Sequence, residues 1–321
     1  MVAFLFRRLL LAFLLVVVSA SAALLLTRLA PGDVTTQLDR TAKADEIADV
    51  RRRFELDRAP LTQWAHWVGR AVRLDFGESF LYNRPVGGLV RASAANTAAL
   101  AVVALAFATV LGIGCGIVTG SQRGWLPAVL RVLSFASVSL PPLLTSLLLA
   151  FVAARTGWLP VGGMTSIDAQ NLSWPAWISD LAWHLPLPVL ALALPLAATF
   201  ERLQSQSIAE ALHQPFVTAA FARGVSRPVV IRRHAWPVSV RAICGVYGIA
   251  VGALLSGSFV VEYVTAWPGL GRLMYEALRA RDIYLVAGCA ATGSMFLAIG
   301  TLLGDLLLAA SDPRVREGAH R

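Results

Sequence analysis

Charge is the scarcest property of this sequence. Only 15% of the 321 residues are Asp, Glu, Lys or Arg, whereas 57% are hydrophobic and the mean hydropathy is +0.65. A soluble domain carries about 25% charged residues, because charge must cover its surface. The deficit therefore excludes an ordinary soluble domain, and the hydrophobic excess excludes an intrinsically disordered chain.

Lysine is nearly absent as well, since Lys43 is the single lysine beside 27 arginines. A Walker A loop needs a lysine behind a glycine-rich stretch, and none precedes Lys43, so we expect no ATP site in this chain. The five histidines have no metal-ligand spacing, and Cys115, Cys244 and Cys289 are dispersed. The sequence therefore predicts no catalytic residue, no bound metal and no cofactor.

Long apolar runs are what the sequence has in place of charge. Because these runs do not alternate as barrel strands do, they predict membrane-spanning helices. Six runs without Asp, Glu, Lys or Arg are long enough to cross a bilayer: Leu9–Thr27, Ala92–Gln122, Val132–Ala154, Leu181–Phe200, Ala242–Val261 and Ile283–Gly304. The first run starts like a secretory signal, but it exceeds the usual 7–15 residues and five more runs follow. We predict an all-α integral membrane protein with six transmembrane helices.

The net charge of +9 indicates orientation rather than nucleic-acid binding. Assigned to the predicted loops, +8 lies on the side of the two termini and +1 on the other side. The positive-inside rule then places both termini in the cytoplasm. The loop over 201–241 alone holds +4, which makes it the most basic cytoplasmic segment.

Glycines at four-residue spacing occur inside two of the predicted spans. They are Gly112, Gly116 and Gly120 in one span and Gly248 and Gly252 in another. Small residues at this spacing let membrane helices approach closely. Gly112–Gly116 has the look of a dinucleotide-binding loop, but it lies mid-span with no strand before it, so we predict helix packing.

The loop over 201–241 contains a short predicted helix. Pro215 can open it and Gly224 can close it in a left-handed conformation, and Ser226 can cap the next helix. Four residues share one face of the short helix: Phe216, Ala219, Ala220 and Arg223. This face can dock a protein on the cytoplasmic side, or the helix can lie on the inner leaflet with its arginines on lipid phosphates.

The same loop carries a recognisable motif. Glu210-Ala-Leu-x-x-x-Phe-Val-x-x-Ala-x-Ala-Arg-Gly224, followed by His234, resembles the EAA loop of ABC importer permeases of the dipeptide/oligopeptide/nickel family. The chain departs from the family pattern at Pro215, Phe221 and Trp236. Other parts of the resemblance run almost the whole length of the chain: Leu29–Asp33, Leu56–Pro60, Asp75–Ser79, Trp158–Gly163, His184–Val189, Phe259–Tyr263, Trp267–Gly271, Arg281-Asp282 and Asp312–Arg316.

The resemblance implies a type I ABC importer permease fold in the bacterial inner membrane. It implies a non-catalytic subunit with a second homologous permease, two cytoplasmic ABC ATPases that bind ATP and Mg²⁺, an external solute-binding protein and membrane lipid as partners, and no nucleic acid. Short peptides, nickel chelates and related solutes are the expected substrates. The residues implied to contact the ATPase are Glu210, Ala211, Phe216, Ala219, Ala220, Arg223, Gly224 and His234.

Three parts of the chain follow from this interpretation. They are residues 1–91 (the first span and a long external loop), 92–312 (a five-helix core with the coupling loop 201–241) and 313–321 (a cytoplasmic tail). The external gate or binding-protein contact is assigned to six residues: Trp64, Trp67, Phe76, Glu262, Trp267 and Gly269. The aromatic residues among them can also lie at the membrane interface, and Gly269 can serve turn formation.

The alternative function is a stand-alone secondary transporter or channel. Such a protein needs charged residues along its path or broken helices in inverted repeats, and the sequence shows neither. We therefore expect the energy source to lie on a partner protein.

Overall fold

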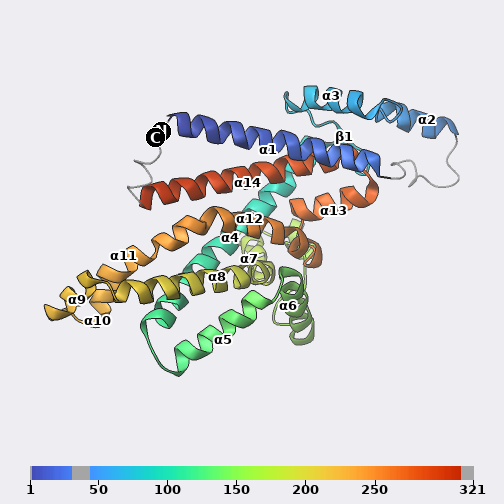
Figure 1. Ribbon diagram of the computed structural model, residues 1–321. Helices are drawn as coiled ribbons and strands as arrows, with labels where there is room; N and C mark the ends of the chain where they lie inside the picture. The colour runs from blue at the N-terminus through green and yellow to red at the C-terminus, as the bar shows by residue number, and fades with distance from the viewer. Residues whose placement is uncertain (1, 31–43, 312–321) are drawn as a thin grey trace. The chain divides into compact units, whose positions relative to one another are not determined.

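The computed structural model describes residues 2–30 and 44–311 of the chain. Within these ranges, five helices are long and apolar enough to cross a membrane, as predicted for an all-α membrane protein (Figure 1). These helices are α1 (Val2–Leu29), α4 (Val86–Ser121), α8 (Pro186–Leu212), α12 (Arg241–Val264) and α14 (Ile283–Ser311). The motif at Asp312–Arg316, the tail 313–321 and most of the motif at Leu29–Asp33 lie outside the described residues.

Shorter elements connect the long helices. Between α1 and α4 lie α2 (Ala44–Arg53), α3 (Pro60–Ala71) and an antiparallel hairpin of β1 (Glu78–Ser79) and β2 (Arg84–Pro85). Between α4 and α12 lie α5 (Trp125–Ser139), α6 (Pro142–Thr156), the 3₁₀ turn η2 (Ile167–Asn171), α7 (Trp174–His184), α9 (Pro215–Ala222), α10 (Arg227–Val230), the π-helical turn η3 (Ile231–Ala235) and α11 (Trp236–Ser239). Between α12 and α14 lies α13 (Leu270–Ala280).

The third predicted span, Val132–Ala154, is not one straight helix. The chain forms α5 and α6, which meet at an angle of 110°. Proline lacks a backbone N–H and disfavours helix in the residue before it, so Pro141-Pro142 ends one helix and begins another. Each helix has 15 residues, about 22 Å at 1.5 Å per residue, which is shorter than the bilayer core. A count of six spans holds only if this bent pair is one crossing.

The fourth predicted span, Leu181–Phe200, also has different bounds. The spanning helix α8 begins at Pro186 and continues to Leu212. Residues 201–212 are therefore the end of a spanning helix and not part of a loop. The charge of Glu201 and Arg202 made this segment read as a loop, whereas burial of Glu201 allows the helix to continue.

The described chain forms two compact units, whose boundaries differ from the predicted division at residue 91. Unit 1 contains Ala99–Trp267 and the chain from Ile299 onward, and unit 2 contains Val2–Ala98 and Pro268–Ala298. The helices α4 and α14 run continuously from one unit into the other. A long helix thus belongs to two packing environments, which a division by sequence position misses.

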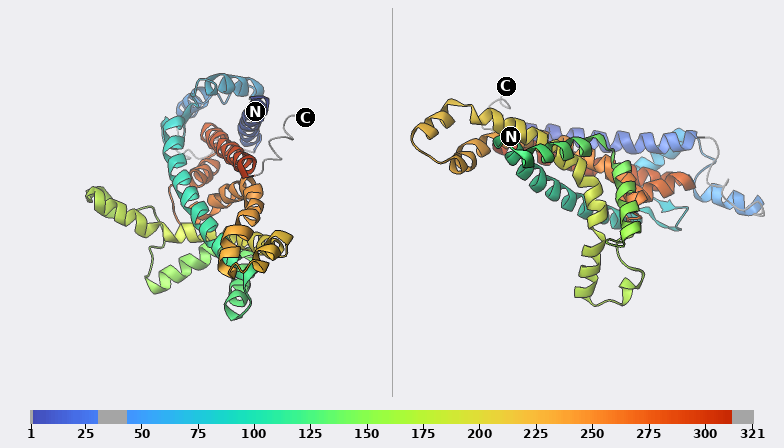
Figure 2. Two further views of the ribbon diagram at one scale, coloured as in Figure 1. Left: turned by 90° about the vertical axis from the view of Figure 1, so that its left-hand side faces the viewer. Right: turned by 90° about the horizontal axis from the view of Figure 1, so that it is seen from below.

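In unit 1, α8 packs against α5, α6 and α12. Figure 2 shows α7 and its connections projecting away from α8. The predicted glycine contact is confirmed: a Cβ at Gly112 would lie 2.6 Å from the Ala197 carbonyl oxygen, and one at Gly116 would lie 2.8 Å from that of Glu201. Gly120 meets Ser205 in the same way. Only glycine allows this approach of α4 to α8.

Of the second predicted glycine pair, Gly248 packs closely within unit 1. Gly248 on α12 lies against Thr301 and Gly304 on α14, and a Cβ at Gly304 would lie 2.8 Å from the Gly248 Cα. The two helices therefore touch backbone to backbone at this point.

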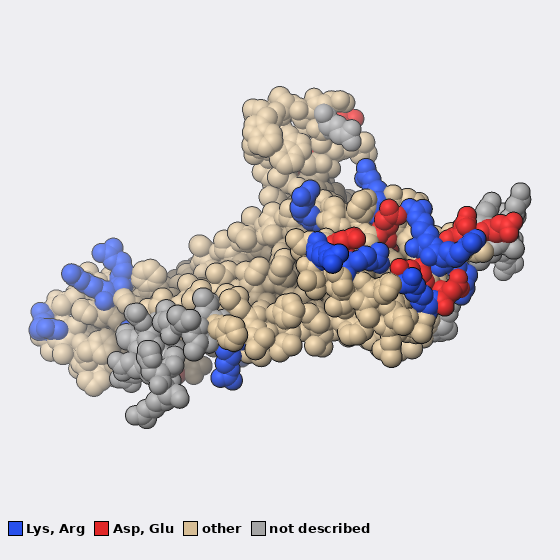
Figure 3. All heavy atoms as spheres, turned by 90° about the horizontal axis from the view of Figure 1, so that it is seen from above, with Lys and Arg blue, Asp and Glu red and all other residues tan. Residues whose placement is uncertain are grey.

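The core of unit 2 is formed by α1, α3, α13, the first half of α14 and the segments around the hairpin. Charged side chains of both signs gather over the part of this unit that carries α2, α3 and the hairpin (Figure 3). They include the exposed pairs Arg51–Asp57 at 2.8 Å and Arg53–Glu78 at 2.5 Å. Exposed pairs of this kind contribute about 0–1 kcal/mol each, so the apolar core carries the stability.

Candidate functional site

The short helix predicted in the cytoplasmic loop is present as α9. Pro215 occupies its first turn, where the missing N–H has no helical partner to lose. Gly224 follows its end at φ +78°, and a Cβ there would meet nothing within 4 Å. The left-handed backbone, and not crowding, is therefore what requires glycine at this position.

The inner face of α9 is formed by Val217 and Ala220. Both are fully buried against Val230 of α10, with Leu212 and Val225 alongside. The predicted docking face therefore needs a correction, because Ala220 packs inward and is not displayed. The spacing does place Ala220 next to Phe216 on the helix, but the side of α9 that carries Val217 and Ala220 anchors the helix and is not available to a partner.

The outer face of α9 is formed by Phe216, Ala219 and Arg223, which are all exposed. Phe216 is 42% exposed and Phe221 is 39% exposed, although a phenyl ring is normally buried in a soluble environment. The Phe216 ring therefore makes an exposed apolar surface on the face that carries the cation Arg223, whereas Phe221 lies on another side of α9 and lines the cavity described below. Such a surface suits a protein partner.

The remaining predicted coupling residues lie on the elements that hold α9. Glu210 is exposed on α8 and accepts a hydrogen bond from Gln206 at 3.0 Å. Ala211 is buried with Ile208 and Ala235. His234 is half-buried on η3. The structure thus joins the end of α8, α9, α10, η3 and α11 into one compact body, which we call the knob (residues 206–239).

The predicted cap by Ser226 is only partly confirmed. Ser226 precedes α10 with an extended backbone, but its side chain makes no capping hydrogen bond. The helix that follows is also not regular, because residues 231–235 form a π-helical turn. Trp236-Pro237 comes directly after this turn, and the proline cannot donate the N–H that a regular helix needs.

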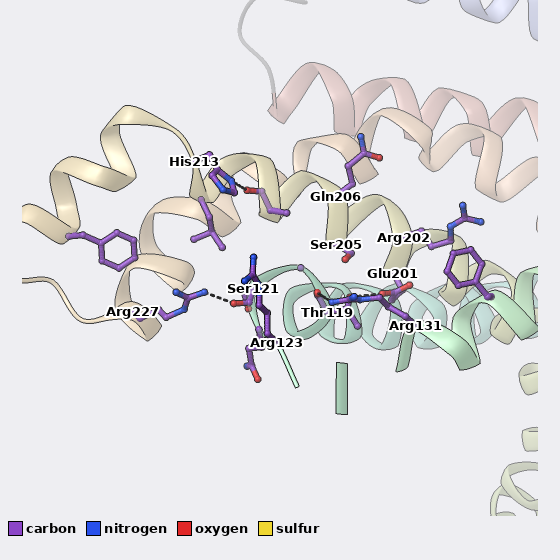
Figure 4. A pocket seen from close by; sticks show the side chains of 16 residues that line it. Thr119, Ser121, Arg123, Arg131, Glu201, Arg202, Ser205, Gln206, His213 and Arg227 are labelled. Atoms are coloured by element: carbon purple, nitrogen blue, oxygen red, sulfur yellow. Dashed lines mark hydrogen bonds between the residues drawn. The ribbon is translucent and has the colours of Figure 1, made fainter. Parts of the chain in front are cut away.

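Two arginines tie the knob and α5 to the end of α4. Arg227 Nη2 donates to the Ser121 carbonyl oxygen at 2.6 Å, and Arg131 Nη2 donates to that of Thr119 at 2.9 Å (Figure 4). The last carbonyl groups of a helix have no partner within it and carry its negative dipole. These guanidinium groups therefore cap α4 with charge-assisted hydrogen bonds.

A cavity of about 1080 Å³ adjoins these contacts. It is lined by the end of α4, the middle of α5, the second half of α8, Phe221 of α9 and the start of α10, and Figure 4 shows its side chains. Four arginines line it: Arg123, Arg131, Arg202 and Arg227. The Arg202 guanidinium lies 4.8 Å from the centre of the Phe135 ring, in a cation–π contact.

A buried carboxylate lies at the wall of this cavity. Glu201 is 2% exposed and accepts a hydrogen bond from the Thr119 hydroxyl group, which joins α8 to α4. Three residues further along α8, Gln204 Nε2 donates to Ser239 Oγ at 2.7 Å, which joins α8 to α11. Neither contact was predicted from the sequence. The available signal was the four-residue spacing of Gly112, Gly116 and Gly120, because Glu201 and Gln204 both lie opposite Gly116.

The predicted external residues on and after α3 are packing residues. The Trp64 indole donates to Ser21 Oγ at 2.8 Å, and the Trp67 indole donates to the Phe76 carbonyl oxygen at 3.3 Å. Trp67 is 3% exposed. Their burial holds α3 against α1 and leaves Trp67 with no surface for a partner to touch.

The predicted external residues in the last turn of α12 and directly after this helix are buried too. Glu262 and Trp267 are 0% and 1% exposed, and the backbone N–H group of Trp267 donates to the backbone carbonyl oxygen of Glu262 at 2.9 Å. Gly269 precedes α13 with an extended backbone, and the turn in this connection lies at Thr265-Ala266 instead of at the predicted Pro268-Gly269. As contacts for an external protein, Glu262 and Trp267 are therefore excluded by burial in this structure.

The external segment is held by a buried aspartate instead. Asp282 accepts hydrogen bonds from Ser79 Oγ at 2.6 Å and from the backbone N–H groups of Leu81 and Leu285 at 3.1 Å each. Burial raises the pKa of this carboxyl group, and its hydrogen bonds oppose that rise. The structure thus joins the Asp75–Ser79 and Arg281-Asp282 motifs, and no sequence pattern indicates this pairing.

A tyrosine makes a second connection in the same place. The Tyr82 hydroxyl group donates to Glu276 on α13. Burial and this hydrogen bond raise the pKa of Tyr82 to about 12. Among the described residues, no group of three or more His, Cys, Asp or Glu side chains is placed to hold a metal ion.

Comparison with known proteins decides the family. Residues 112–317 match the family described as the inner membrane component of binding-protein-dependent transport systems. The chain belongs to this family. The matched range includes the glycine contact of α4, the cavity and the whole knob. The chain is thus an integral, multi-pass component of a transport system in the bacterial inner membrane.

Relatives match over almost the whole chain. A putative peptide permease protein of Brucella ovis is 32% identical over 274 residues, 84% of each chain. A putative peptide transport system permease protein of Brucella abortus is 30% identical over 320 residues, 98% of this chain and 99% of the relative. The oligopeptide transport system permease protein AppB of Bacillus subtilis is 25% identical over 319 residues, with the same coverage.

Proposed function

We propose that this chain is the permease subunit of an ABC importer that takes up peptides or related small solutes. The family match supports a transport subunit. The names of the Brucella and Bacillus relatives, which all refer to peptide or oligopeptide transport, support this substrate class. The chain forms the translocation path together with a second homologous permease.

In this proposal, the knob couples transport to ATP. The helix α9 presents Phe216, Ala219 and Arg223 to a cytoplasmic ATPase, and a solute-binding protein delivers the solute at the outer side. The ATPases hold ATP and Mg²⁺, since the one lysine of this chain has no phosphate-binding loop before it. ATP acts through its different affinity for the inward-facing and outward-facing states.

The observation that carries the proposal is the way the knob is anchored. Its inner face is buried through Val217 and Ala220, and Arg227 binds the end of α4. A load applied to the outer face of α9 is thus passed to two spanning helices, α8 and α4. A loosely attached loop would absorb the same load.

Co-purification tests the proposal. We expect the tagged chain, extracted from the membrane of its own bacterium, to carry a second permease and ATP-hydrolysing subunits, and the complex to take up peptide in liposomes only with ATP and the binding protein. A stand-alone carrier or channel is the competing function. Peptide transport by the purified chain alone would overturn the proposed function in favour of that alternative.

A further inference from the structure

An apolar groove of about 710 Å³ lies within unit 2, away from the knob. Its walls are α1, the turn after α3, the start of α4 and the first half of α14. A concave, mainly apolar space of 300–1,000 Å³ with few polar groups has the character of a small-molecule site. Neither the family match nor the proposed function assigns anything to it.

The polar groups in the groove wall already have partners within the chain. The Trp67 indole donates to the Phe76 carbonyl oxygen at 3.3 Å, and the Thr292 hydroxyl group donates to that of Gly288 at 2.9 Å. The Ser21 hydroxyl group accepts from Trp64. Water in the groove would therefore gain few hydrogen bonds, and an apolar occupant is favoured.

The groove is open toward the surface where lipid chains lie. Phe13 on α1 and Met295 on α14 line it, and they are 59% and 46% exposed on helices that cross the membrane. Val72 and Leu74 extend the apolar wall along the turn after α3 and are even more exposed. An acyl chain can enter sideways without crossing a polar surface.

Two glycines at the start of α4 keep the groove wide. A Cβ at Gly88 would meet nothing within 4 Å, and one at Gly87 would come no closer than 3.9 Å to the Phe76 ring. They differ in this from Gly112 and Gly116, which a neighbouring backbone requires. Gly87 and Gly88 therefore leave open space at the wall of the groove and do not serve close helix packing.

One cation lies at the mouth of the groove. Among the described residues that line it, Arg91 alone carries a charge. It lies three residues after Gly88, on the same helix face, directly before the charge-free run that starts at Ala92. This position is the membrane–water boundary on the side that the charge bias assigns to the outside, which is where phosphate groups of the outer leaflet lie. Arginine binds phosphate through paired hydrogen bonds.

We propose that this groove holds one glycerophospholipid of the outer leaflet, with its phosphate on Arg91 and an acyl chain that runs past Ala20 and Ala291 in the direction of Phe13 and Met295. The lipid fills the space between α1, α4 and α14 that side chains leave open. It thereby covers part of α1, of which little is buried by the rest of the chain.

Photolabelling tests this site in the full-length chain. The chain is placed in nanodiscs of phosphatidylethanolamine and phosphatidylglycerol with a trace of phospholipid that carries a diazirine in one acyl chain. We expect labelled peptides to concentrate on residues 13–21 and 291–296. Even labelling of all lipid-facing helices, or crosslinks of these peptides to another protein, would overturn the proposal.

Two pairs of variants sharpen the test. A Cβ at Gly88 meets nothing within 4 Å, so Gly88→Leu places a side chain in the groove, and the loss of acyl contact worth about two methylene groups lowers labelling about tenfold. Gly69→Leu on α3 is the control, because a Cβ there also meets nothing within 4 Å and Gly69 does not line the groove, so labelling is unchanged. Arg91→Gln lowers labelling by the phospholipid but not by a diacylglycerol with the same chain, whereas Arg73→Gln, outside the groove, affects neither. Unchanged labelling in Gly88→Leu, or equal loss of both probes in Arg91→Gln, would refute the assignment.

Discussion

Gly224 is the residue whose replacement tests the coupling helix most sharply. It ends α9 at φ +78°, where its N–H donates to the Phe221 carbonyl oxygen at 2.9 Å and the next N–H donates to that of Ala220 at 3.2 Å. A residue with a Cβ pays about 1–2 kcal/mol for the left-handed backbone, and valine, with its branched Cβ, is among the least suited.

Gly224→Val therefore has two unfavourable outcomes of similar size. It keeps the turn with about 1–2 kcal/mol of strain, or it releases the last turn of α9 and loses two hydrogen bonds worth about 1 kcal/mol each. A change of 1.4 kcal/mol is tenfold in an equilibrium, so we expect ATP-dependent uptake to fall about tenfold. Membrane insertion stays normal, because a Cβ at this position touches nothing.

Two controls separate coupling from general instability. Asparagine tolerates the left-handed backbone, so Gly224→Asn retains most of the uptake. Gly157 ends α6 in the same conformation, at φ +68°, and a Cβ there also meets nothing within 4 Å. Gly157→Val thus creates the same strain outside the knob and leaves uptake near normal. Uptake at the unmodified level in Gly224→Val, measured in proteoliposomes at equal protein, would refute the coupling role.

Three further predictions concern anchoring contacts. Arg227→Gln removes the charged donor from the end of α4, so the thermal midpoint of the detergent-solubilised chain falls by an amount that corresponds to about 1–2 kcal/mol. Arg232→Gln, on the exposed face of η3, leaves the midpoint unchanged. Equal midpoints of the two variants would contradict the capping of α4 by Arg227. Burial and the hydrogen bond to Glu276 raise the pKa of Tyr82 from 10 to about 12, and the difference between the ultraviolet titrations of the unmodified chain and Tyr82→Phe measures it. Because the pKa is raised in the folded chain, the stabilising effect of the protonated hydroxyl group is complete below pH 10 and is lost as the pH rises through 12. Ionisation of Tyr82 at pH 10 would exclude the hydrogen bond. Asp282→Asn leaves one oxygen to accept several hydrogen bonds, so it destabilises the external segment by about 1–3 kcal/mol and proteolysis of this segment becomes faster. The control variant Asp57→Asn changes an exposed ion pair and costs under about 1 kcal/mol. Equal proteolysis of the two variants would rule out the anchoring role of Asp282.

The parts of this fold that depend on local chemistry were predictable from the sequence. Apolar runs predicted the spanning helices, and Pro215 and Gly224 predicted both ends of α9, because each residue acts on its own backbone. The glycine spacing of α4 predicted close packing, because three small residues at one face have few other uses in a membrane. These features need no knowledge of what lies opposite.

The parts that depend on tertiary partners were not predictable. Ala220 shares a helical face with Phe216, and nothing in the sequence states that Val230 covers one edge of that face. Glu201 was interpreted as a loop charge, because its partner Thr119 is 82 residues away. Trp67 was interpreted as a contact residue because it is aromatic and lies in a predicted external loop, but α1 and Phe76 bury it. Each error comes from a contact with a different structural element, which the local sequence pattern does not contain.

The central claim is that α9 meets an ATPase, and photocrosslinking from position 216 tests it most directly. A photoreactive phenylalanine analogue replaces Phe216 in the full complex in native membranes, with the same analogue at the exposed Trp183 of α7 as the control. We predict a crosslink from position 216 to an ATP-hydrolysing subunit, with a yield that changes when ATP is added, and none from position 183. Crosslinks from position 216 to lipid alone, in a complex that still transports, would contradict the account.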